Sequence, residues 1–121
     1  MVEKSTFENI VILKLKGHMD LERIKEVEEV FQSSLNEGHI NFIVNMLDVK
    51  DISSSGVAIL LAMFRKLELN NGRMALSELS AVSDYVLDLA GLSDSFSIYH
   101  GDNEALDSFL LPDLPRRLRD V

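Results

Sequence analysis

The sequence predicts an α/β domain whose mixed, mostly parallel β-sheet has four or five strands and packs with about four helices. Short runs rich in β-branched and other apolar residues alternate along the chain with longer stretches whose apolar residues follow helical spacing. The 121 residues suffice for one hydrophobic core but not for two. Strands that alternate with helices pair in parallel through right-handed crossovers, so we expect antiparallel pairing only at the first one or two strands.

Two strands and a helix are predicted before the centre of the chain is reached. Residues 9–16 are rich in β-branched side chains and stop at Gly17, which predicts a strand, and residues 2–7 form a shorter candidate strand before it. Asp20 is a suitable N-cap for a helix whose apolar residues follow helical spacing up to the next glycine. The mostly apolar residues 40–46 predict a strand covered on both faces.

Each later element has its own start or stop signal. Serines precede two apolar segments, and asparagine or glycine follows the same two segments. The predicted elements are a helix from the serine cluster at 53–55 to about Asn70, a strand over 73–77, a helix from Ser80 to Gly91, a strand over 96–99 and a helix over 102–111. Prolines at 112 and 115 then stop regular structure, so we expect a domain over 1–111 and a mobile tail over 112–121.

The net charge limits the classes of partner. It is −8 for the chain and −10 for residues 1–115, because three arginines lie in the last six residues. Such an acidic body disfavours nucleic acid or an anionic membrane as the main partner. No apolar run approaches the ~20 residues that span a bilayer, the N-terminus carries no export signal, and cysteine is absent. We therefore expect a cytoplasmic protein without a membrane span, as a monomer or weak dimer.

The serine cluster is the main candidate functional site. Ser53, Ser54 or Ser55 is a suitable N-cap for the apolar helix that follows, because a short side-chain oxygen accepts a free backbone N–H there. The same N–H groups and the helix dipole favour an anion, including a phosphate on serine. The cluster is therefore either a simple helix cap or a phosphorylation switch.

The apolar run from Val57 to Phe64 also has two interpretations. Its eight residues lack a polar side chain, which exceeds what one face of an amphipathic helix requires. Either the run is wholly buried, or the surface near Val57 and Leu61 stays exposed as a docking patch beside Ser54.

Signals of catalysis or of a cofactor are weak. The histidines at 18, 39 and 100 lack the spacing of a metal-binding pair and are expected in loops. The chain has no Gly-x-Ser-x-Gly segment, and its one glycine after the serines is not followed by Lys-Ser or Lys-Thr. We expect no enzyme activity, no cofactor and no metal.

Four segments and the order of the elements resemble the STAS domain family, and within it the small bacterial anti-sigma factor antagonists. The resemblance covers roughly residues 7–110. The segments are Gly17-His-Met-Asp20, Ile43-Val-Asn-Met-Leu-Asp48, Ile52-Ser-Ser-Ser-Gly-Val-Ala-Ile-Leu-Leu61 and Ala81-Val-Ser-Asp-Tyr-Val-Leu-Asp-Leu-Ala-Gly-Leu92.

This resemblance implies a regulator that acts through protein partners. In such a family an anti-sigma factor serine-protein kinase phosphorylates the first serine of Asp-Ser-Ser-Gly, and a PP2C-type phosphatase removes the phosphate. The unmodified antagonist captures the kinase and frees the sigma factor. The matching serine is Ser54, with Ser53 and Ser55 as alternatives. The expected partner surface comprises Asp20, Ser53, Ser55, Gly56, Val57 and Leu61.

One departure from the family pattern leaves an alternative function open. Ser53 stands where the family usually has aspartate, so the charge beside the acceptor is missing unless Asp51 supplies it. The alternative is a constitutive STAS accessory or scaffold subunit, in a signalling scaffold or a lipid-transport complex, in which Ser54 is only structural.

Overall fold

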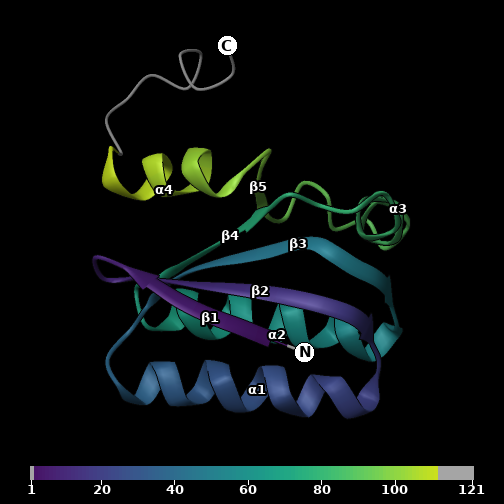
Figure 1. The fold of residues 1–121 in the computed structure, drawn as a ribbon, viewed down its shortest axis with the longest axis horizontal. Helices are drawn as coiled ribbons and strands as arrows, with labels where there is room; N and C mark the ends of the chain where they lie inside the picture. The colour runs from purple at the N-terminus through teal and green to yellow at the C-terminus, as the bar shows by residue number, and fades with distance from the viewer. Residues whose placement is uncertain (1, 112–121) are drawn as a thin grey trace.

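The sheet of the computed structural model has five strands that lie side by side in chain order, and the structure describes residues 2–111. Helices α1 and α2 cover one face (Figure 1), and Leu87 of α3 belongs to the same hydrophobic cluster as their buried residues, whereas α4 packs on the opposite face against Ile43 and Ala75. The strands are β1 (Val2–Phe7), β2 (Ile10–Met19), β3 (Asn41–Ile52), β4 (Arg73–Ser77) and β5 (Ser97–Tyr99). The helices are α1 (Leu21–Asn36), α2 (Ser54–Leu69), α3 (Ala81–Leu89) and α4 (Asp102–Leu110).

The strand pairing confirms the predicted mixed sheet. β1 pairs antiparallel with β2, and each later pair is parallel. The helices between the parallel strands provide the crossovers that such pairing requires. Because β2 and β3 are parallel neighbours, α1 and α2 both begin at the same end of the sheet (Figure 1).

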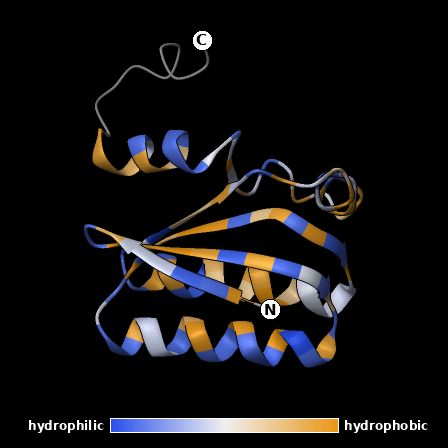
Figure 2. Ribbon diagram, viewed as in Figure 1, coloured by the Kyte–Doolittle hydropathy of each residue, from blue (hydrophilic) through white to orange (hydrophobic). Residues whose placement is uncertain are grey.

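Two hydrophobic clusters hold the layers together. The larger cluster lies between the sheet and α1 and α2, and strand residues such as Phe42, Val44 and Met46 contribute to it. The smaller cluster is centred on Ile43 and Ala105 beneath α4. Apolar and polar segments accordingly alternate along β2 and along α1 (Figure 2). Residues 42–46 are all buried, as expected for a strand covered on both faces.

The predicted helix starts are confirmed by their side-chain hydrogen bonds. The Asp20 carboxylate accepts from the backbone N–H of Arg23 at 3.1 Å, which caps α1. Ser80 caps α3 in the same way, accepting from the N–H of Ser83. Among the three serines at the start of α2, the cap is Ser53.

The predicted ends of two strands were wrong. The strand predicted over 9–16 continues to Met19, and the strand predicted over 40–46 continues to Ile52. Gly17 does not break β2: it takes a positive φ of 84° next to a shift in the β2–β3 register. The register shifts interrupt the regular alternation, so beyond Met46 the buried residues of β3 recur every third position rather than every second.

Three further expectations concern the histidines, the C-terminal tail and membrane-spanning helices. Of the three histidines, His39 and His100 lie outside the helices and strands, but His18 belongs to β2 and was wrongly expected in a loop. The predicted tail over 112–121 lies outside the described residues. Within residues 2–111, no helix is long and apolar enough to cross a membrane.

Candidate functional site

The candidate site lies where β2 and β3 end together. Met19 and Ile52 are paired at the last step of the β2–β3 ladder, and each strand then passes directly into a helix. The backbone N–H of Ser53 donates to the carbonyl oxygen of Met19 at 3.1 Å, which ties the start of α2 to the start of α1. Asp20 and the serine cluster, which are over thirty residues apart in sequence, are therefore brought to one edge of the sheet.

The Ser53 hydroxyl both donates and accepts a hydrogen bond. It donates to the Met19 carbonyl oxygen at 2.9 Å and accepts from the backbone N–H of Gly56 at 3.2 Å. The side chain is half-buried. Ser53 is therefore the helix cap, and its hydroxyl cannot be modified without breaking the hydrogen bond that it donates to Met19.

Replacing Ser53 with alanine is expected to reduce the free energy of unfolding by about 1–2 kcal/mol, because the cap of α2 and the link to Met19 are both lost. Urea denaturation measures the change. Ser55→Ala is the matched control: the Ser55 side chain is exposed and bonds no described residue, so the expected change is within about 0.5 kcal/mol. Equal effects of the two substitutions would contradict the capping role.

Ser54, like Ser55, is an accessible serine of the cluster. It is the first residue of α2, it is exposed, and its side chain makes no hydrogen bond to any described residue. The backbone N–H groups of Ser54 and Ser55 likewise have no acceptor among residues 2–111. An exposed hydroxyl thus stands beside free N–H donors at the positive end of the helix dipole, which is a favourable position for an anion.

Gly56 lies below this surface rather than on it. A Cβ atom at this position would lie 2.8 Å from Cγ2 of Ile52 and 2.9 Å from the Met19 carbonyl oxygen. The glycine allows the first turn of α2 to sit directly on the two strand ends. We therefore correct its expected role: Gly56 is buried and shapes the site from beneath, with no side chain to offer a partner.

The exposure of the side chains in the apolar run after the serines agrees fully with neither interpretation. Leu60 and Met63 are buried, whereas Val57 and Leu61 are half-buried and thus neither wholly covered nor freely exposed. A more exposed apolar side chain is Leu21, which directly follows Asp20 and is 66% exposed. Leu21 was not predicted as a site residue, because an apolar residue in the first turn of an amphipathic helix usually belongs to its buried face.

Several charged side chains near this edge of the sheet contact a side chain that can carry the opposite charge. The Asp51 carboxylate lies 2.5 Å from Nδ1 of His18, and both side chains are exposed. Further along β2, Lys16 donates to Glu3, which lowers the pKa of Glu3 and raises the pKa of Lys16. The Asp51 carboxylate is therefore directed at His18, so its negative charge does not act on the serine cluster alone.

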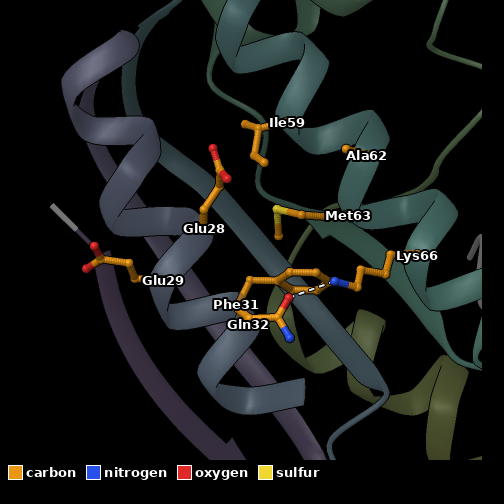
Figure 3. A pocket seen from close by; sticks show the side chains of 8 residues that line it. All are labelled: Glu28, Glu29, Phe31, Gln32, Ile59, Ala62, Met63 and Lys66. Carbon is orange, nitrogen blue, oxygen red and sulfur yellow. Dashed lines mark hydrogen bonds between the residues drawn. The ribbon is translucent and has the colours of Figure 1, made fainter. Parts of the chain in front are cut away.

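A groove of about 380 Å³ separates the middle parts of α1 and α2 (Figure 3). Phe31, Ile59 and Met63 line it, and the Lys66 ammonium donates to the Gln32 side-chain oxygen at 2.7 Å across one end. Within the described residues no ion pair joins Lys66 to an acidic group. No group of three metal-ligating side chains occurs in residues 2–111 either.

Comparisons with known proteins agree with this fold. The model of the STAS domain family matches residues 1–105. An anti-sigma-B factor antagonist of Staphylococcus epidermidis is 24% identical over 100 residues, which are 83% of this chain and 93% of the relative. The solved anti-sigma factor antagonist SpoIIAA in its unphosphorylated form has a TM-score of 0.78 and 22% identity, covering 100% of this chain and 98% of its own.

A second solved structure is that of the Bacillus cell fate determinant SpoIIAA in its phosphorylated form, with a TM-score of 0.74 and 22% identity over 90% of this chain and 99% of its own. Both SpoIIAA structures therefore share the architecture described above over nearly their whole length. With the family model matching 105 of 121 residues, the chain belongs to the STAS domain family.

Proposed function

We propose that this chain is an anti-sigma factor antagonist switched by phosphorylation of Ser54. In its unmodified form it binds an anti-sigma factor serine kinase and so releases a sigma factor, which regulates transcription in the cytoplasm. The kinase supplies the ATP and the catalysis, and a PP2C-type phosphatase resets the switch. The chain itself is a regulator without chemistry of its own, in keeping with the antagonists that it resembles.

The observation that carries this proposal is that two adjacent serines have different roles in the structure. Ser53 caps α2 through two hydrogen bonds, which leaves the exposed Ser54 hydroxyl with no structural task among the described residues. A phosphate on Ser54 would gain the free N–H donors and the dipole of α2, so the domain would tolerate it. A partner seated against Asp20, Leu21 and Ser54 would instead meet up to two new negative charges.

The partner surface follows from the same geometry. Asp20, Ser55 and Leu21 are exposed around Ser54, and Val57 and Leu61 are half-exposed on the following turns of α2. This surface combines three apolar side chains, two small hydroxyls and one carboxylate. It is suited to a partner that buries Leu21 and the Ser54 hydroxyl together, and such a contact excludes a phosphate.

Phosphorylation itself tests the proposal directly. Incubation of the full chain with its cognate kinase and ATP is expected to add one phosphate, observed by intact mass and assigned to Ser54 by peptide mapping. Ser54→Ala is expected to remain unmodified, whereas Ser55→Ala is expected to accept the phosphate as the wild type does. An unmodified wild-type chain would exclude the switch.

That negative outcome would favour a second candidate function, a constitutive STAS accessory or scaffold subunit. The observation in its favour is the acidic group missing beside the acceptor. Ser53 occupies the position before Ser54, and the Asp51 carboxylate is directed at His18. In such a subunit the partner would bind through the same edge without a chemical switch.

A further inference from the structure

The last part of the described chain, residues 74–111, contains no lysine or arginine. Residues 74–111 carry seven acidic side chains, whereas residues 2–73 carry eleven acidic and nine basic ones. The first group therefore contributes −7 and the second only −2. Residues 74–111 contain α3, β5 and α4. All the formal charges of this part of the chain are therefore negative.

Helix α3, which belongs to this acidic segment, carries an exposed apolar stripe. Val82, Tyr85 and Leu89 are 41%, 64% and 69% exposed. Their spacing of three and four residues places them on one face of the helix. The opposite face attaches the helix to the domain, because Ser83 and Leu87 are buried. The exposed stripe is thus not needed for the core.

A row of carboxylates runs beside the stripe. Asp84 and Asp88 are both exposed and, four residues apart, lie on the same side of α3. Neither forms an ion pair with a described residue. The outer face of α3 therefore presents apolar side chains next to unpaired negative charge, which is an unusual face to leave in water.

The charge row decides between the possible occupants. A second copy that packed face to face through α3 would bring the two Asp84–Asp88 rows together, which costs repulsion. We propose that the outer face of α3 docks a segment of another protein in which lysine or arginine accompanies apolar side chains. Burial of Tyr85 and Leu89 supplies the affinity, and the carboxylates of Asp84 and Asp88 select basic partners. The stripe lies on α3, whereas Ser54 lies on α2.

The test uses the full chain and two synthetic amphipathic helical peptides with the same leucine positions, one rich in lysine and the other rich in glutamate. Isothermal titration at physiological ionic strength is expected to show binding of the lysine peptide and none of the glutamate peptide. The double variants Tyr85→Ser/Leu89→Ser and Asp84→Asn/Asp88→Asn are each expected to weaken binding at least tenfold. Thermal melts of these variants check that the domain remains folded.

Two control variants test the location. Leu69→Ser removes an apolar side chain that is 86% exposed at the end of α2, and Ser54→Asp changes the proposed switch. Both are expected to bind the lysine peptide as the wild type does. Amide shift changes in nuclear magnetic resonance spectra are expected to centre on α3, so the result is independent of whether Ser54 is phosphorylated.

Three results would overturn the proposal. Undiminished binding by Tyr85→Ser/Leu89→Ser would show non-specific attraction to an acidic protein. Amide shift changes centred on Glu22, Glu26 and Glu29, three of the acidic residues of α1, would place the site elsewhere. Binding that occurs only after substitution of the tail arginines 116, 117 and 119 by glutamine would show that the face is already taken by this chain's own C-terminus.

Discussion

Ser54→Asp is expected to weaken binding to the anti-sigma factor kinase about thirtyfold or more, equivalent to ~2 kcal/mol, while leaving the domain folded. The carboxylate would stand at an exposed position in the centre of the proposed partner surface, where an apolar or acidic partner group must desolvate or repel it. In the free domain the same charge meets the favourable end of the α2 dipole, so the expected change in unfolding free energy is within about 0.5 kcal/mol. Surface plasmon resonance and thermal melting measure the two quantities.

The matched control for this variant is Ser54→Asn. Asparagine is similar in size to aspartate and carries no charge, so its expected effect on kinase binding is several-fold smaller. If asparagine weakened binding as much as aspartate, the effect would be steric, and charge would not explain the switch. If aspartate bound as tightly as the wild type, Ser54 would not lie in the interface.

Gly56→Ala is expected to destabilise the domain by about 2–3 kcal/mol, the second large effect. The added methyl group would lie 2.8 Å from a methyl carbon of Ile52 and 2.9 Å from the Met19 carbonyl oxygen, so α2 must move away from the two strand ends. The movement also stretches the Ser53 hydrogen bonds to Met19. Urea denaturation measures the loss of stability.

A glycine elsewhere provides the control for Gly56→Ala. Gly101 is the N-cap residue of α4, its φ is extended, and a Cβ atom there would meet nothing within 4 Å. Gly101→Ala is expected to change the unfolding free energy by less than about 1 kcal/mol. A stable Gly56→Ala variant that still bound the kinase would contradict the close contact at the strand ends.

The sequence predicted the order and type of the elements because each has its own local signal. Caps such as Asp20 and Ser80 and runs such as residues 40–46 depend on side chains close in sequence. The far half of β3 was missed for the opposite reason. Its register shifts against β2 depend on a strand more than twenty residues away, and they turn the expected alternation into a three-residue pattern.

The choice among the three serines could not be made from the sequence either. Ser53, Ser54 and Ser55 are equally good caps by residue type. What selects Ser53 is the carbonyl oxygen of Met19, which lies thirty-four residues earlier in the chain and accepts the Ser53 hydroxyl. The burial of Gly56 depends on the same approach of two strand ends. Local rules thus predicted a helix start at the serine cluster, and the tertiary contact assigned the cap to Ser53.

The margins of the sheet influence how this protein can associate. On one margin β1 exposes residues 3–7, with the oppositely charged Glu3 and Lys4 adjacent, and on the other β5 is three residues long. A charged edge strand and a very short edge strand are both poor templates for an incoming strand, so edge-to-edge association between the sheets of different chains is disfavoured. Recognition is left to the helices, where a partner can dissociate and the regulator can be used again.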